Sequence, residues 1–162
     1  DVHWARREEW KGREYVFAMT QFGEFTLMVQ RNNAMGWTFP GGFLNYRVHG
    51  TKSKKGMELI SAAADFVLTE ANIPVFLRDA SVVAYGYGID EINSRILMIH
   101  WVLLAPASTF PPAPHANMNT TSDAKWVAMD DPRSGKCLRQ RLEESVAAGE
   151  GGSVILKPCN PY

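Results

Sequence analysis

Short runs of apolar residues, or of apolar residues that alternate with polar ones, predict strands along the chain. These strand-like segments lie before and after one segment with a helical pattern. Aromatic and branched residues fill two early segments, and the polar turn between them predicts a β-hairpin. A later pair of such segments, joined by a short connection, predicts a second hairpin. The strands predicted from these patterns are residues 15–20, 25–31, 37–40, 81–87, 95–104 and 125–129.

The strongest helical pattern covers residues 57–71, where alanines fill the centre and apolar residues recur at helical spacing. Asn72 suits a left-handed cap after this helix, and Pro74 prevents its continuation. A second helix is predicted at residues 135–148. One early and one late helix with a mixed sheet between them predict an α/β domain with three layers, α/β/α.

Length and composition fit a single domain of the α/β class. The chain has 162 residues, of which 46% are hydrophobic and 21% charged, as in ordinary globular proteins. We predict an N-terminal arm at residues 1–13, a domain at 14–148 and a tail at 149–162. Two long loops are expected within the domain, at residues 43–55 and 106–123, the second rich in Pro, Ser, Thr and Asn.

The charge balance and the cysteines exclude several classes of protein. Lysines and arginines number 17, aspartates and glutamates also 17, so the basic excess of a general DNA-binding or membrane-surface protein is absent. Cys137 and Cys159 form neither a disulfide framework nor a zinc-binding pair, which is typical of an intracellular protein. The longest apolar run, residues 96–105, is too short to cross a bilayer.

Residues 36–73 resemble the signature segment of a known family. Residues 37–42, Trp-Thr-Phe-Pro-Gly-Gly, resemble the opening of the box that defines Nudix hydrolases. That box reads G-x5-E-x7-R-E-U-x-E-E-x-G-U, where U is aliphatic, and residues 56–73 align with its second part without a gap. The resemblance implies a Nudix-type α/β/α sandwich with a mixed sheet.

The aligned residues keep the frame of the box and lose most of its charged side chains. Met57 stands on the first family glutamate. Asp65 and Phe66 stand on the Arg-Glu pair, and Thr69 and Glu70 on the Glu-Glu pair. The vestigial box positions are Gly41, Gly42, Gly56, Met57, Asp65, Phe66, Thr69 and Glu70.

The substitutions remove most of the ligands for a metal ion. Nudix enzymes cleave diphosphates with a divalent cation, usually Mg²⁺, held by several glutamates on one helix face. At ~100° per residue, Phe66, Thr69 and Glu70 span about 100° of that face, whereas Asp65 and Glu58 lie ~140° and ~120° from Glu70. Glu70 is therefore the one residual metal ligand, and no catalytic residue is predicted. Acids that could approach it from loops are Asp90, Glu91 and Asp123.

Several residues near the box or outside it have an expected structural role. We interpret Glu70 alternatively as an acid on the helix surface that is either kept by hydrogen bonds or solvated, and Phe66 as filling the vacated metal pocket with apolar contacts. His100, within a strand, is predicted to be half-buried with its polar atoms satisfied. Trp4 and Trp10, on the polar arm, are candidates for docking on a partner.

A basic run lies in the loop that is longer than in the family pattern. It could contact phosphates of RNA, because the loop borders the former substrate pocket, or it could be an ordinary solvated loop. These candidate phosphate or RNA contacts are Arg47, Lys52, Lys54 and Lys55.

Three functions are compatible with these patterns. The first is a catalytically degenerate Nudix-fold protein, a structural or RNA- or protein-binding subunit of a larger assembly such as a mitochondrial ribonucleoprotein, by analogy with degenerate members of the family in such particles. The alternative is a divergent hydrolase that cleaves a nucleoside diphosphate derivative or RNA 5′ phosphates with Mg²⁺. The third is a small-molecule sensor that binds a nucleotide without cleaving it. No cofactor is expected, except Mg²⁺ if the chain is the divergent hydrolase.

Overall fold

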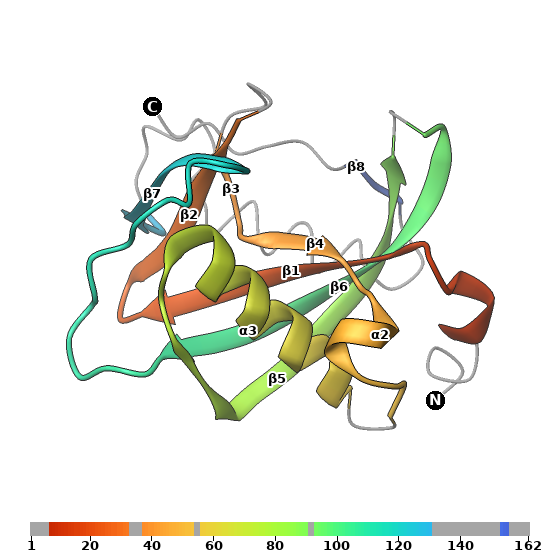
Figure 1. Ribbon diagram of the computed structural model, residues 1–162, viewed down its shortest axis with the longest axis horizontal. Helices are drawn as coiled ribbons and strands as arrows, with labels where there is room; N and C mark the ends of the chain where they lie inside the picture. The colour runs from red at the N-terminus through yellow and green to blue at the C-terminus, as the bar shows by residue number, and fades with distance from the viewer. Residues whose placement is uncertain (1–6, 33–36, 54–55, 91–92, 131–152, 156–162) are drawn as a thin grey trace.

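The chain folds as an eight-stranded mixed sheet with a long helix packed on one face (Figure 1). The computed structural model describes residues 7–32, 37–53, 56–90, 93–130 and 153–155. The helical elements are η1 (Arg7–Trp10), α2 (Tyr46–His49) and α3 (Met57–Ala71). The strands are β1 (Glu14–Phe22), β2 (Phe25–Arg31), β3 (Trp37–Thr38), β4 (Gly41–Phe43), β5 (Val75–Asp90), β6 (Arg95–Pro106), β7 (Thr121–Ala128) and β8 (Ser153–Ile155).

The sheet combines parallel and antiparallel pairs in the order β3-β2-β1-β6-β5-β8, with β4 paired to β1 and β7 to β2. β1 pairs with β6, and β5 with β8, in parallel, and the other pairs are antiparallel. The predicted α/β class with a mixed sheet is therefore confirmed. The helix predicted at residues 135–148 lies outside the described residues. No described helix is long and apolar enough to span a membrane.

Side chains of the central strands alternate between two apolar layers. Val16 and Ala18 of β1 pack with Val102 of β6 in the layer beneath α3. Phe17 of β1 and Trp101 of β6 point to the opposite face, where their rings stack with centroids 4.8 Å apart. This alternation follows from the two-residue period of a strand. The core that positions the helix thus lies between α3 and the middle of the sheet.

The elements predicted within the described residues are present, and several are longer than their patterns indicated, whereas the strand predicted at residues 37–40 covers only Trp37–Thr38. β5 begins at residue 75, whereas its pattern predicted a start at 81. The pattern misses the first residues because register shifts against β6 between Phe76 and Ser81 interrupt the alternation of side chains. β7 begins at residue 121 instead of 125. The predicted loop 43–55 contains α2, whose four residues are too few to produce a helical periodicity; the Asn45 side chain caps it by accepting a hydrogen bond from the Arg47 amide.

The end of α3 is held by the long connection between β6 and β7. Asn72 closes the helix in the left-handed region, with φ 57°, as predicted. Three groups of the connection and of the start of β7 then satisfy the carbonyls of the last helical turn, which have no partner within the helix. The bonds run from His115 N, Asn117 Nδ2 and Thr121 Oγ1 to the carbonyl oxygens of Ala71, Thr69 and Glu70, at 2.8, 2.8 and 2.9 Å.

Within the expected arm, residues 7–10 form η1 and pack against the sheet. Trp10 contacts Tyr87 of β5, with ring centroids 5.2 Å apart, and carries the Arg13 guanidinium 4.5 Å above its ring. Trp10 is thus half-buried by neighbours in the same chain, and its docking on a partner stays a prediction. Trp4 lies outside the described residues.

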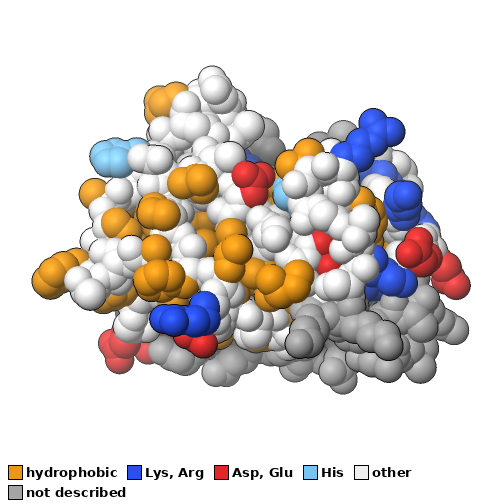
Figure 2. Space-filling view, turned by 60° about the horizontal axis from the view of Figure 1, so that its bottom comes forward, with side chains coloured by type: hydrophobic (Ala, Val, Ile, Leu, Met, Phe, Trp, Pro, Cys, Tyr) orange, Lys and Arg blue, Asp and Glu red, His pale blue; other side chains and the backbone are white. Residues whose placement is uncertain are grey.

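One outer face of the molecule exposes apolar side chains. Figure 2 shows them gathered over α3 and β5, with few charged groups between them. The exposed large apolar residues of α3 and of the first half of β5 are Met57, Leu68, Phe76, Leu77 and Val83.

Candidate functional site

The two glycines of the box lie on β4, which pairs with β1 in the sheet and contacts α3; this place is called the glycine crossing. In the antiparallel pairing of β4 with β1, Gly41 lies opposite Phe17 and Gly42 opposite Val16. A Cβ built on Gly41 would lie 2.5 Å from the Val16 carbonyl oxygen, and one built on Gly42 would lie 2.7 Å from Cε1 of Phe66. Backbone therefore requires glycine at Gly41, whereas at Gly42 an added Cβ would require the Phe66 ring to shift.

Glu70, in the last turn of α3, is buried beneath this crossing and is only 4% exposed. Its carboxylate forms an ion pair with Arg31 Nη1 at 2.7 Å and accepts a hydrogen bond of 3.3 Å from the Gly41 amide. Arg31, at the end of β2, also donates from Nη2 to the Gly41 carbonyl oxygen at 2.8 Å. The expected position of Glu70 on the helix surface is therefore wrong, because β4 and the Arg31 side chain cover it, whereas the alternative that hydrogen bonds keep this acid agrees with its contacts.

The surroundings of Glu70 oppose its ionisation. Burial raises the pKa of Glu70 to about 7, although Arg31 and the Gly41 amide lower it. Burial likewise raises the pKa of Tyr15, which lies beside Arg31. Near neutral pH the Glu70 carboxyl is accordingly divided between its protonated and ionised forms.

The other two residues of this helix face, Phe66 and Thr69, carry no charge. The Phe66 ring lies against Gly42 and meets the His49 ring edge-on, with centroids 5.4 Å apart. Thr69 is exposed, and its hydroxyl donates to the Asp65 carbonyl at 2.9 Å within the helix. Phe66 makes apolar contacts, as we interpreted from the sequence.

The other box positions do not turn toward Glu70. Gly56 caps the start of α3 in the left-handed region, with φ 68°, and Met57 after it is exposed. Asp65 Oδ2 lies 3.4 Å from His49 Nε2 on α2. The acids that were expected to approach from loops do not do so: Asp90 ends β5 and pairs with Arg95 at 3.0 Å, and Asp123 lies in β7 and accepts a hydrogen bond from the amide that follows it. Glu91 lies outside the described residues.

These residues do not fit a divalent cation. Mg²⁺ requires about six oxygen ligands in octahedral geometry. Here one carboxylate is present, and a guanidinium already occupies it. In the described part of the chain, no group of three or more His, Cys, Asp or Glu side chains could hold a metal ion.

A second group of ionisable side chains lies under the first turn of α3, where Arg7, Glu14, Glu58 and His100 are buried and Tyr46 is half-buried. Arg7 of η1 pairs through Nε with Glu14 of β1 at 2.8 Å, and through Nη1 with Glu58 of α3. The Tyr46 hydroxyl of α2 donates to Glu14 at 2.7 Å, and His100 Nε2 of β6 lies 3.1 Å from Glu14. The network therefore joins five elements of the fold.

Burial and hydrogen bonds within the network shift the pKa values of Glu14 and His100. Burial raises the pKa of Glu14, but hydrogen bonds from His100, Arg7 and Tyr46 outweigh it and lower that pKa to about 2. Burial lowers the pKa of His100, which is fully buried and not half-buried as predicted. One cation thus faces two carboxylates, all sequestered from water, which suits a structural role.

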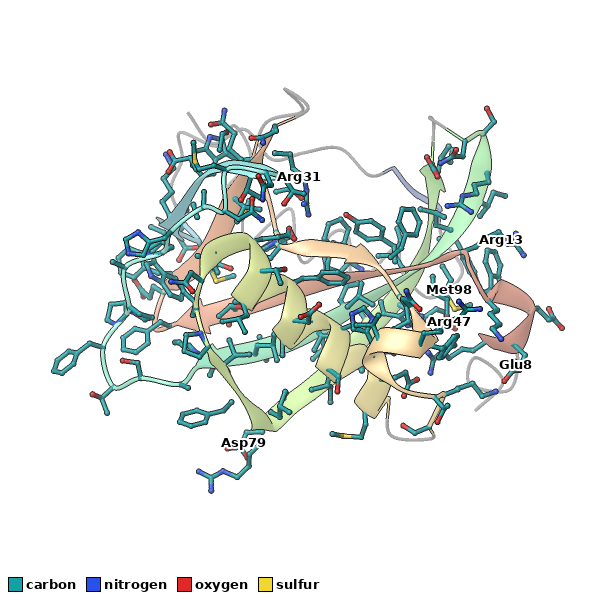
Figure 3. All side chains as sticks on the ribbon, in the orientation of Figure 1. Glu8, Arg13, Arg31, Arg47, Asp79 and Met98 are labelled. Atoms are coloured by element: carbon teal, nitrogen blue, oxygen red, sulfur yellow. The ribbon has the colours of Figure 1, made fainter. Side chains whose placement is uncertain are left out.

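The candidate phosphate contacts lie apart from the Arg31–Glu70 pair. Figure 3 shows the labelled Arg47 near Arg13 and Glu8 at one end of the molecule, whereas Arg31 lies above α3 at the end of β2. Arg47 is exposed on α2, and Lys52 is paired with Glu8 at 3.6 Å. Lys54 and Lys55 lie outside the described residues.

Arg31 and Arg7 are the residues that the sequence patterns missed. Arg31 carries no signal, because it ends an ordinary strand before a polar turn. A signal did exist for Glu14, which is in phase with the inward-facing Val16 and Ala18 of the same strand. An acid in that phase of a buried strand requires a buried partner.

Comparisons with known proteins show what fold these elements form. No family model and no curated protein matches the sequence. Among solved structures, a Nudix hydrolase from Nitrosomonas europaea is similar with a TM-score of 0.60 at 17% identity, over 86% of this chain and 92% of that one. A bifunctional NMN adenylyltransferase/ADP ribose pyrophosphatase from Francisella tularensis, with AMP and a manganese ion, has a TM-score of 0.57 at 19% identity. That match covers 90% of this chain and 45% of the other, so this chain spans less than half of the bifunctional protein. The chain has the Nudix fold.

Proposed function

We propose that this Nudix-fold chain is not a metal-dependent hydrolase and acts as a binding subunit of a larger assembly. The observation that carries the proposal is the position of the Arg31 guanidinium, which binds both the Glu70 carboxylate and the Gly41 carbonyl oxygen. The Glu70 carboxylate and the Gly41 carbonyl oxygen are the two oxygen ligands through which the end of α3 and the glycine crossing could bind a cation. The chain thus supplies its own cation to the residual site.

A guanidinium cannot perform the chemistry of the metal. Mg²⁺ binds water directly and activates it for attack on phosphorus, whereas arginine stays protonated in proteins and has no open coordination position. A metal ion would have to displace Arg31 and compete with the proton that Glu70 binds near neutral pH. After displacing Arg31, the metal ion would have a single protein carboxylate as ligand, that of Glu70, because Phe66 and Thr69 have no carboxylate.

A binding role is supported by the apolar face over α3 and β5 (Figure 2). Leu68, Phe76 and Leu77 are each about half exposed there, at 48, 50 and 46%. Contiguous exposed apolar surface in a stable protein commonly marks an interaction site. By analogy with degenerate Nudix-like subunits, we propose that the assembly is a ribonucleoprotein and that its compartment is the mitochondrion.

We expect the purified chain to release no AMP from ADP-ribose in millimolar Mg²⁺ or Mn²⁺, beyond the background of its Glu70→Gln variant. The reason is the lack of oxygen ligands described above. Product release is measured by chromatography, with Glu24→Gln, at an exposed position, as the matched control. Metal-dependent turnover that Glu70→Gln abolishes and Glu24→Gln retains would establish the divergent hydrolase instead.

The binding role predicts that the tagged chain, expressed in its own cells, sediments with large particles. Sedimentation of the chain as a free monomer would contradict the binding role.

The pH dependence of stability should reveal the buried carboxyl. The folded pKa of Glu70, about 7, lies above its ordinary value of 4.5, so the native state favours the protonated form. The stability gained from protonation is present below pH 4.5 and is lost as the pH rises through 7. Relative to Glu70→Gln, the wild-type chain should lose up to about 3 kcal/mol of unfolding free energy across this window. Urea unfolding at several pH values measures the difference, and parallel curves for the two proteins would contradict the expectation.

A further inference from the structure

The segment of residues 110–114, Phe-Pro-Pro-Ala-Pro, has a backbone conformation that is determined by its own sequence. Every residue in it is either a proline or directly precedes one. Proline fixes φ near −65°, and the residue before a proline is excluded from the helical region. The segment is therefore restricted to an extended, polyproline II-like path, and residues 111–117 accordingly form no helix or strand.

The rest of the fold holds this segment in place between β6 and β7. The Ala107 amide donates to the Pro74 carbonyl at 2.9 Å before it. Trp126 Nε1 donates to the Pro112 carbonyl at 2.8 Å in its middle, and the His115 amide is bonded at 2.8 Å after it. Figure 1 shows the connection running around the outside of the molecule, past the last turn of α3. The segment is thus fixed along one side and presented to solvent on the others.

The side that faces solvent is apolar. Phe110 is 76% exposed, the highest value among the exposed large apolar side chains of the described residues. With three residues per turn, Phe110 and Ala113 share one face of a polyproline II helix, and Pro111 and Pro114 share the next. Pro112, whose carbonyl is bonded to Trp126, occupies the third face toward the domain.

The segment also lacks the charges that other partners would need. Residues 106–122 contain no Lys, Arg, Asp or Glu, so they offer nothing to a phosphate backbone or to a charged protein surface. A rigid, uncharged, proline-rich surface with a projecting aromatic ring matches one recognition mode, insertion into a groove lined by aromatic side chains. Binding of a preformed segment costs little conformational entropy.

We propose that residues 110–114 are a docking site for a partner domain with an aromatic-lined, polyproline-binding groove. The inference rests on the proposed function as a binding subunit and names the chemistry of one partner. Pro111 and Pro114 fill neighbouring pockets of the groove, and Phe110 anchors the end of the segment. The Trp126 and His115 hydrogen bonds keep the segment from collapsing onto the domain.

The test uses the full ¹⁵N-labelled chain with purified polyproline-binding domains as probes, one of the WW type and one of the Src-homology 3 type. At least one domain should bind with micromolar affinity and shift resonances of the segment and its flanking residues. Phe110→Ala and the double variant Pro111→Ala/Pro114→Ala should each weaken binding about tenfold or more. Met118→Ala, equally exposed in the same connection, should change the affinity less than about twofold.

Two results would overturn the proposal. One is the absence of binding by both domains at about millimolar concentration. The other is binding that the Phe110 and proline variants leave unchanged while their melting temperatures stay at the wild-type value. Both outcomes are independent of the hydrolysis and sedimentation assays, so this inference and the proposed function fail separately.

Discussion

Replacing Arg7 by methionine is expected to lower the unfolding free energy by about 3–5 kcal/mol, the cost of breaking a buried ion pair from one side. Arg7 is completely buried and is the cation that faces both Glu14 and Glu58. Methionine has a similar length but no charge, so the carboxylates of Glu14 and Glu58 would remain in the interior without the guanidinium that pairs with them. Because total stability is typically about 5–15 kcal/mol, the variant should unfold at much lower urea concentration than the wild type.

A matched control for this substitution is Arg13→Met. Arg13 lies close by but is half-buried, with its guanidinium over the Trp10 ring and one hydrogen bond to the Glu9 carbonyl. Its loss should cost less than about 1 kcal/mol, the scale of an exposed cation–π contact. The Arg7→Met deficit should also shrink toward pH 5, where the stranded carboxyls take up protons. Equal effects of the two substitutions would mean that the buried network does not stabilise the fold.

The sequence could predict those elements whose signals are local. The helix at residues 57–71 was placed correctly because alanines, the cap at Asn72 and the break at Pro74 all act within one segment. The first half of β5 was missed because its register shifts, with Asp79 at a positive φ of 67°, disrupt the two-residue period. Bulges depend on the partner strand, which a single segment does not reveal.

The site was predicted only in part because its decisive residues are distant in the chain. Helical geometry identified the face that carries Phe66, Thr69 and Glu70, and the structure places Phe66 and Glu70 beside the two glycines. The same geometry could not reveal that Arg31, from another element, covers Glu70. Likewise, Arg7 and Glu58 are 51 residues apart and meet only through the tertiary fold.

The glycine crossing connects the fold to the site, and Gly41→Ala is expected to destabilise the chain by about 3–5 kcal/mol, the range of severe single substitutions. The added Cβ would lie 2.5 Å from the Val16 carbonyl oxygen, a backbone atom of the central strand. Relief requires β4 to move away from β1. That movement would also lengthen the bonds from Gly41 to Glu70 and Arg31 and leave the carboxyl less well compensated.

Gly42→Ala is the matched comparison, because its Cβ meets a side chain instead of a backbone. The nearest atoms belong to the Phe66 ring, at 2.7 and 2.8 Å, and the ring can shift toward solvent. We therefore expect a smaller loss, about 1–3 kcal/mol, as for an overpacked site. In the double variant Gly42→Ala/Phe66→Leu much of this loss should disappear, whereas no change at Phe66 should rescue Gly41→Ala. If urea unfolding shows Gly41→Ala to be as mild as Gly42→Ala, β4 can leave β1 freely, and Arg31 and Gly41 do not hold Glu70 rigidly enough to exclude a metal ion.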